Sequence, residues 1–121
     1  MSETIELGKA GEVIAAEFIK EKGYLILERN WKFGKTEIDI IARDGIFTVI
    51  VEVKTRSSNF FAEPEAAVTR KKQRILVRAA NAFMNYRKQR GEVRFDVIAI
   101  LILPGSQQVN HIEDAFYATL R

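Results

Sequence analysis

The sequence predicts an α/β sandwich, in which one mixed β-sheet lies between helices. Three observations lead to this fold class. Two segments have the periodicity of amphipathic helices, five segments have the composition of strands, and their order along the chain is α-β-β-β-α-β-β. The chain has 121 residues, of which 47% are hydrophobic and 29% charged, so we expect one domain over residues 1–121 with one modest core.

The first expected helix covers residues 7–22, and Gly23 follows as a typical C-terminal stop. At 100° per residue, most apolar side chains share one arc and the charged ones occupy the other. Glu12 is the exception, because it falls within the apolar arc among small residues. An ionised carboxylate in that position needs a partner or an upward shift of its pKa.

The next three elements are expected to be strands. The dipeptide Asp44-Gly45 is a strong hairpin signal because it stands between two apolar segments. A further turn is expected at residues 33–35, around Gly34. The predicted strands cover residues 24–32, 36–43 and 46–55.

The second half of the chain is expected to contain one long helix and two strands. Residues 56–64 are expected to form a polar loop, and the helix is expected to start between residues 65 and 69 and to end near Arg90, with Gly91 as its stop. Residues 94–103 are almost continuously apolar, which predicts a central strand covered on both faces. After Pro104-Gly105, residues 109–117 are expected to form an edge strand.

The hairpin register predicts a cluster of carboxylates. If Asp44-Gly45 forms the turn, Arg43 faces Ile46, and strand alternation divides the hairpin into two faces. Asp39 and Glu52 are then diagonal neighbours with Cα atoms about 7–8 Å apart. The core face holds Ile38, Ile40, Val49, Val51 and Val53, and the other face holds Glu37, Asp39, Ile41, Ile50, Glu52 and Lys54.

Two interpretations of the acidic face are open. In the first, it is a solvated surface on which Lys54 pairs with Glu52. In the second, a cation offsets the repulsion between Asp39 and Glu52, and Glu12 joins them. Two apolar residues on the acidic face and the unpaired Glu12 favour the metal site. Because the chain has no cysteine and one histidine, carboxylates must supply the ligands, which suits Mg²⁺ or Mn²⁺.

Positive charge is concentrated in the second expected helix. Residues 66–91 contain eight basic residues and no acidic one. A solvated surface is one explanation, but so many uncompensated charges favour contact with nucleic-acid phosphates, without reading of base sequence. The residues expected to contact DNA here are Lys71, Lys72, Arg74 and Arg78.

A few other polar and aromatic residues carry weaker expectations. Asp96 lies in an apolar strand, where an ion pair with an arginine explains it at least as well as catalysis. His111 is assigned no role, and Gln73 is either a plain exposed glutamine or a residue that positions water or metal. Among aromatic residues that could stack on bases, Trp31 and Phe33 are expected to be core or loop anchors, which leaves Phe60 and Phe61.

These residues together resemble a known family. Asp39, followed one strand later by Glu52-Val53-Lys54 and preceded by Glu12, resembles the PD-(D/E)XK nuclease superfamily. Over nearly its full length the chain resembles the YraN-type family of bacterial predicted endonucleases. One departure is Thr36, where that family usually has glycine. The matching stretches are residues 8–12, 27–31, 37–42, 51–58, 94–97 and 111–116.

The resemblance implies a restriction-endonuclease-like fold and a catalytic site. Relatives in the superfamily include archaeal Holliday junction resolvases, which place a helix Glu, an Asp, a Glu and a Lys in the same order. By that resemblance Asp39 and Glu52 would bind Mg²⁺ or Mn²⁺, and Lys54 would orient or polarise the attacking water. Glu12 would either complete the metal site or act from behind the ligands. Arg56 and Ser57 would join the DNA-binding residues, with Glu37 and Gln73 as accessory residues.

The implied function is metal-dependent, structure-selective hydrolysis of phosphodiester bonds in DNA, by a protein that is a homodimer if it resembles the resolvases. The alternative is a catalytically weak or inert nucleic-acid-binding module on the same fold. The N-terminal residues lack the order of a signal peptide, and no apolar run approaches about 20 residues. We therefore expect a cytoplasmic protein without a membrane partner.

Overall fold

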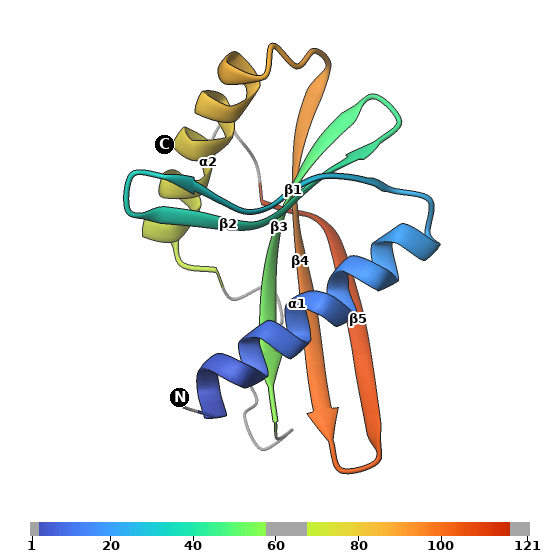
Figure 1. The fold of residues 1–121 in the computed structure, drawn as a ribbon. Coiled ribbons are helices and arrows are strands. Elements are labelled where there is room, and N and C mark those ends of the chain that lie inside the picture. The colour runs from blue at the N-terminus through green and yellow to red at the C-terminus, as the bar shows by residue number, and fades with distance from the viewer. Residues whose placement is uncertain (1–2, 58–67, 117–121) are drawn as a thin grey trace.

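Two helices and a five-stranded sheet make up the part of the chain that the computed structural model describes, residues 3–57 and 68–116 (Figure 1). The element order α-β-β-β-α-β-β and the mixed sheet confirm the predicted fold class. Phe60, Phe61 and Tyr117 lie outside the described residues. The elements are α1 (Glu3–Glu21), β1 (Leu25–Phe33), β2 (Thr36–Asp44), β3 (Phe47–Arg56), α2 (Arg70–Tyr86), β4 (Glu92–Leu103) and β5 (Ser106–Phe116).

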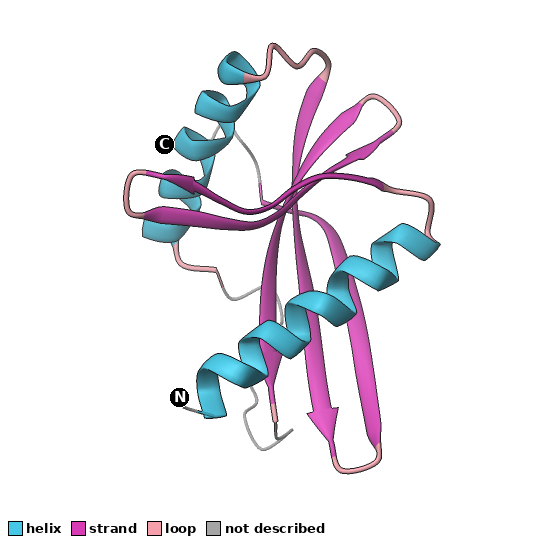
Figure 2. Cartoon of the chain, in the orientation of Figure 1, coloured by secondary structure: helices cyan, strands magenta, loops and turns pink. Residues whose placement is uncertain are grey.

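The strands follow the chain in space, in the order β1-β2-β3-β4-β5. Each neighbouring pair is antiparallel except β3 and β4, which are parallel. A parallel pair needs a crossover connection, and α2 lies within it. Figure 2 shows the strong twist of this sheet, in which the β1–β2 hairpin runs at a steep angle to the other three strands.

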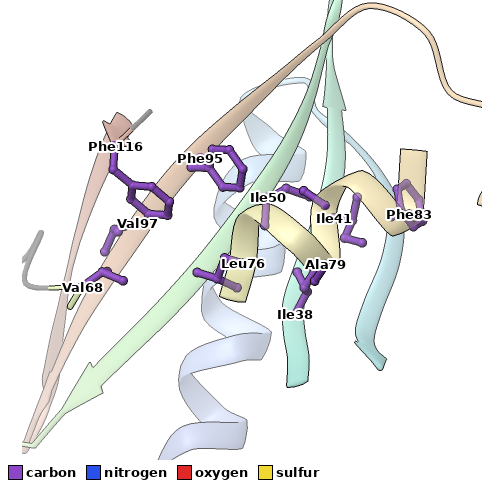
Figure 3. Packing of buried hydrophobic residues seen from close by; sticks show 11 residues of the cluster. Ile38, Ile41, Ile50, Val68, Leu76, Ala79, Phe83, Phe95, Val97 and Phe116 are labelled. Carbon is purple, nitrogen blue, oxygen red and sulfur yellow. The ribbon is translucent and has the colours of Figure 1, made fainter. Parts of the chain in front are cut away.

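Two apolar clusters fill the space on the two faces of the sheet. Between α1 and the sheet, Ala15 and Ile19 pack against Val49, Val51 and Ile98. Neighbouring residues of the same strands point to the other face, where α2 covers them (Figure 3). Strand β4 is therefore internal and covered on both faces, as its apolar sequence predicted. The cluster under α2 comprises Ile38, Ile41, Ile50, Val68, Leu76, Ala79, Ala80, Phe83, Phe95, Val97 and Phe116.

The first helix ends as predicted. Gly23 has a φ of +96°, and the N–H of the next residue, Tyr24, reaches back to the carbonyl of Ile19 at 3.0 Å. This is the six-residue hydrogen bond of a glycine-terminated helix. The helix begins earlier than predicted, at Glu3.

The second helix ends earlier than predicted, at Tyr86 and not near Arg90. Lys88 adopts a φ of +51°, and the N–H of Gln89 bonds to the carbonyl of Met84 at 3.0 Å. A lysine thus occupies the left-handed position that glycine usually takes after a helix. Gly91, the predicted stop, has another role.

Gly91 allows two segments of backbone to approach closely. A Cβ atom at this position would overlap the carbonyl oxygen of Ile46, and the N–H of Glu92 bonds to that same oxygen at 3.2 Å. The glycine therefore lets the start of β4 lie beside the β2–β3 turn.

The β2–β3 register differs from the predicted one. Asp44 pairs with Phe47, so the turn consists of Gly45 and Ile46 and not of Asp44 and Gly45. Gly45, with a φ of +60°, suits the first central position of a type II′ turn. Asp44 stays in the strand and its carboxylate accepts a hydrogen bond from Arg94 at 2.9 Å. Each β2 residue therefore faces a β3 residue two positions further along than predicted.

The predicted division of the hairpin into faces is wrong for one residue. Ile40 lies under α1 with its β3 neighbours, but Ile38 lies under α2 with Ile41. The pairing between β2 and β3 ends at Ile40 and Val51, and beyond that point β2 follows β1 away from β3. Simple alternation fails because the strand bends where it loses its partner.

Candidate functional site

Helix α1 approaches β3 closely at one glycine. A Cβ atom on Gly11 would overlap the side chain of Thr55, so only glycine fits there without a shift of the helix or the strand. Glu12 is the next residue, and it is half-buried. The close contact therefore brings the Glu12 side chain to the end of β3 that carries Glu52 and Lys54.

Asp39 lies where β2 separates from β3. Its Oδ2 atom accepts a hydrogen bond from the backbone N–H of Val53 at 2.8 Å. Burial raises the pKa of Asp39 to about 7, and the negative charges of Glu52 and Glu12 add to that rise. The Val53 hydrogen bond and the positive charge of Lys72 act in the opposite direction, but they are outweighed.

Glu52 shares this environment. Continuing the observed register by one residue from Ile40 and Val51 places Glu52 level with Asp39. Burial raises the pKa of Glu52, Glu12 adds to the rise, and the positive charges of Lys72 and Lys54 oppose it. We call Glu12, Asp39 and Glu52 the carboxylate cluster. It draws its members from α1, β2 and β3, and a lysine of α2 faces it.

Asn30 is a site residue that the sequence analysis missed. Its Nδ2 atom donates to Oε1 of Glu12 at 2.9 Å. Asn30 lies within β1 and yet has a φ of +53°, a left-handed conformation that asparagine tolerates better than most residues. The signal in the sequence was an asparagine inside a strand, where it is disfavoured.

Carboxylates are the chemical type of ligand that a hard divalent cation prefers. In this structure, however, the described acidic side chains are not spaced as metal ligands. Within residues 3–57 and 68–116, no three His, Asp or Glu side chains are gathered closely enough to hold a metal ion. Oδ2 of Asp39 and Oε1 of Glu12 already accept hydrogen bonds. Asp39 and Glu52 are the residues that could hold a cation, with Glu12 nearby.

The four predicted DNA-binding residues of α2 divide into two groups. Lys72 is half-buried and acts on both Asp39 and Glu52. Lys71, Arg74 and Arg78 are exposed along the helix, at the spacing of three and four residues that forms one stripe. The predicted DNA-binding residues of α2 thus lead from the carboxylate cluster along the outside of the helix.

Two further predicted DNA-binding residues follow the cluster along the chain at the end of β3. Arg56 is the last residue of β3 and is half-buried, and Ser57 is exposed in the bend after it. Both are two to three positions beyond Lys54 and so lie near the cluster.

The two accessory candidates do not join the cluster. Glu37 is exposed on β2 and pairs across the strand with Lys32 of β1. Gln73 is half-buried, not exposed, and its Nε2 atom donates to the carbonyl of Val68 at 2.8 Å. Gln73 therefore fastens the segment that leads into α2.

Comparison with known proteins identifies the family of this chain. The family model described as "Uncharacterised protein family UPF0102" matches residues 11–100, which include the carboxylate cluster, Asn30 and all of α2. The chain belongs to the UPF0102 family. This confirms, at the level of the family, the resemblance found in the sequence.

Relatives in UPF0102 match over nearly the whole chain. The UPF0102 protein of Bacteroides thetaiotaomicron is 48% identical over 120 residues, covering 99% of both chains. The UPF0102 protein of Flavobacterium johnsoniae is 46% identical over 121 residues, covering 97% of this chain and 98% of the relative. A UPF0102 protein of Thermodesulfovibrio yellowstonii is 47% identical over 113 residues, covering 93% and 97%.

This UPF0102 chain also contains a second polar group, centred on Asp96. The carboxylate is fully buried and accepts two hydrogen bonds from Arg94, at 3.0 and 2.9 Å, which confirms the predicted arginine partner. Burial alone would raise the pKa of Asp96, but hydrogen bonds from His111, Arg94 and the Asp114 N–H hold it below its ordinary value. Arg94 also donates to the hydroxyl of Tyr24 at 2.6 Å.

His111, to which the sequence assigned no role, belongs to this second group through its structural contacts. Its Nε2 atom lies 2.7 Å from Oδ2 of Asp96, and its Nδ1 atom lies 2.8 Å from Nζ of Lys22. The ring also packs edge-on against Phe18 and Tyr24. These partners come from distant parts of the chain, and the group joins α1 to β4 and β5.

None of the helices in the described part of this UPF0102 protein has the length and apolar character needed to cross a membrane. Most of the strongly apolar side chains of both helices face the sheet, although Ile5 and Val13 of α1 are exposed.

Proposed function

We propose that this UPF0102 protein is a metal-dependent endonuclease of the PD-(D/E)XK type, which hydrolyses phosphodiester bonds in DNA and prefers branched or junction structures. The observation that carries the proposal is the convergence of α1, β2, β3 and α2 on the carboxylate cluster, with Lys54 and Lys72 beside it. Acidic groups are seldom brought together out of water without a ligand of opposite charge, because their repulsion costs stability.

The donor set supports Mg²⁺ or Mn²⁺. Asp39 and Glu52 offer carboxylate oxygens, which are the hard ligands that these ions prefer. Both groups have a raised pKa, mainly through burial, and a bound cation would return them to the ionised form. When bound, such an ion supplies charge neutralisation at the phosphate oxygens and lowers the pKa of its water.

The lysines supply the other part of the chemistry. Lys54 follows Glu52 by two residues in β3, so both side chains point to the same face of the strand. Its ammonium group, held beside the carboxylates, can orient a water molecule or a phosphate oxygen. Lys72 faces the same carboxylates from α2 and can hold a second phosphate oxygen.

Contacts with DNA phosphates would continue outward from the carboxylate cluster. Lys71, Arg74 and Arg78 along α2, with Arg56 and Ser57 at the end of β3, would bind the DNA backbone without reading bases. A junction with two-fold symmetry would favour a homodimer. A DNA substrate would favour a cytoplasmic location.

A second candidate function is a nucleic-acid-binding module with weak or no catalysis. One observation favours it, which is that the described carboxylates are not gathered as a three-ligand set. The module would use the same basic stripe and bind DNA equally well with and without divalent cations.

The test is cleavage of matched junction, flap, single-stranded and duplex DNA, and of RNA, with Mg²⁺ or Mn²⁺. The parent is expected to cut a branched DNA, and E52Q to cut none of them while binding as before. E17Q is the matched control, because Glu17 is exposed on α1 and pairs with Lys20. Activity in E52Q equal to the parent, or no cleavage by the parent at all, would contradict the proposal, and the second would favour the binding module.

A further inference from the structure

A small pocket lies between α2 and the strand ends that flank the β1–β2 turn. It has a volume of about 130 Å³ and is lined by Phe33, Thr36, Ile75 and Arg78. The lining combines an aromatic ring, a hydroxyl group, an aliphatic side chain and a guanidinium group. None of these residues belongs to the carboxylate cluster.

The aromatic wall of the pocket is rigidly supported. The Phe33 ring is parallel to the Trp31 ring, with an interplanar angle of 3° and centroids 6.4 Å apart. Trp31 is in turn held edge-on against the buried Phe83, with centroids 5.3 Å apart. Phe33 itself remains 41% exposed, so of the two expectations, a core or a loop anchor, the core anchor does not apply. Next to Trp31, Tyr86 is 72% exposed.

On the side of the pocket formed by α2, the neighbouring charges are all positive. Arg78 lines the pocket, and Arg74 and Lys71 precede it on the same stripe of α2. The sequence has no acidic residue between residues 66 and 91. An apolar peptide or a lipid tail would gain little from these charges, whereas a ligand with a flat ring and a phosphate group matches both halves of the lining.

We propose that this pocket binds an unpaired nucleobase of the DNA substrate, which stacks on Phe33 while Arg78 contacts an adjacent phosphate. The inference rests on the proposed function and deepens it, because it assigns the preference for branched DNA to single-stranded nucleotides at the branch. Every base has a flat face, so the pocket selects unpaired structure and not sequence.

The distance between the pocket and the carboxylate cluster determines which nucleotide of the strand can stack in the pocket. Lys72 faces the cluster and Arg78 lines the pocket, six residues further along the same helix. A rise of about 1.5 Å per residue separates them by about 9 Å along the axis. The stacked base is therefore expected within a few nucleotides of the phosphate at the cluster, on the same strand.

The sole tryptophan, Trp31, reports on the pocket directly, because it lies against Phe33. The full-length protein is titrated without divalent cations with a single-stranded DNA of about ten nucleotides, with the same strand lacking its bases, and with duplex. The expected result is quenching of Trp31 fluorescence by the strand that has bases, and little quenching by the other two.

Two variants separate stacking from charge. F33L is expected to weaken binding of the single strand about tenfold and to leave the strand without bases unaffected. R78Q is expected to weaken both and to reduce the slope of log K against log salt by about 0.7. R90Q, which removes a similar charge beyond the end of α2, and I46A at the β2–β3 turn should bind as the parent does. Circular dichroism checks that each variant is folded.

The outcomes distinguish this inference from the proposed function. F33L that binds the single strand as tightly as the parent overturns the pocket, whether or not the parent cuts DNA. A parent that shows the expected quenching and variant effects but no cleavage with Mg²⁺ or Mn²⁺ supports the pocket and overturns the nuclease. A parent that binds no nucleic acid overturns both.

Discussion

Oδ2 of Asp39 accepts a hydrogen bond from the backbone N–H of Val53 at 2.8 Å, at the place where β2 and β3 separate. A side chain thus takes over from the backbone in satisfying a donor that the neighbouring strand no longer reaches. Asp39 therefore has a structural contact and a candidate catalytic position at once. The two can be separated, because an amide oxygen accepts the same hydrogen bond without carrying a negative charge.

We expect D39N to be more stable than the parent at pH 8 without divalent cations. The pKa of Asp39 is raised to about 7 from 3.8 in the unfolded chain, so the folded protein holds this proton more tightly. That contribution is fully present below about pH 3.8 and is lost as the pH rises through 7. The rise in pKa corresponds to roughly 4 kcal/mol as an upper limit.

Thermal unfolding in EDTA between pH 5 and 8 checks this prediction. The melting temperature of the parent should fall over this range more steeply than that of D39N, and the difference at pH 8 should reach at least about 4 °C. A D39N variant that melts well below the parent at pH 8 would mean that the carboxylate takes part in a stabilising ion pair.

Divalent cations should stabilise the parent selectively. An ion that binds only the folded protein adds about 2.7 kcal/mol at a concentration one hundred times its Kd. We expect Mg²⁺ or Mn²⁺ to raise the melting temperature of the parent, and to raise that of D39N and E52Q much less. E17Q should respond as the parent does. An equal response of all four proteins would show that the ions act elsewhere.

Asn30 is expected to position Glu12. N30G removes the hydrogen bond to Glu12 but accepts the φ of +53° without strain. It should therefore weaken metal-induced stabilisation and cleavage while changing stability little. N30A removes the same bond and also strains the backbone, so it should cost about 1 kcal/mol more. If N30G keeps the parent's metal response, Asn30 has no part in the site.

The contact between Gly11 and Thr55 should resist even one added methyl group. G11A is favoured by helix propensity, but its Cβ would overlap the Cβ and the branched end of Thr55, so we expect a net loss of about 1–3 kcal/mol. Thr55→Gly in the same protein should recover part of that loss. Denaturant unfolding of the two single variants and the double variant measures this coupling. Additive effects would mean that the helix simply moves away from the strand.

Asp96 should behave oppositely to Asp39, although both are buried carboxylates. Its pKa is held below the ordinary value, so its contribution to stability is present above about pH 3.8 and is lost as the pH falls through its folded pKa. D96N leaves Arg94 without its buried ion pair, and we expect a loss of about 3–5 kcal/mol at pH 7. A small effect would mean that Asp44 and Tyr24 hold the guanidinium group unaided.

Local patterns in the sequence were enough for much of the fold. Helical and strand periodicities and the glycine after α1 depend on neighbours within a few positions, so the element order was predictable. The convergence of Asp39 and Glu52 was also predictable, because a hairpin brings nearby segments together and a shift of two residues preserves the alternation of faces along the paired part of the strands.

The rest depended on contacts between residues far apart in the sequence. Arg94 keeps Asp44 in its strand and so moves the turn to Gly45 and Ile46. Glycine is required at position 91 by the close approach of a carbonyl group from the β2–β3 hairpin, and not by the end of the preceding helix. Lys22 and Asp96 reach His111 across 89 and 15 positions. Such pairings are settled by packing and hydrogen bonding of the whole sheet, which no local period encodes.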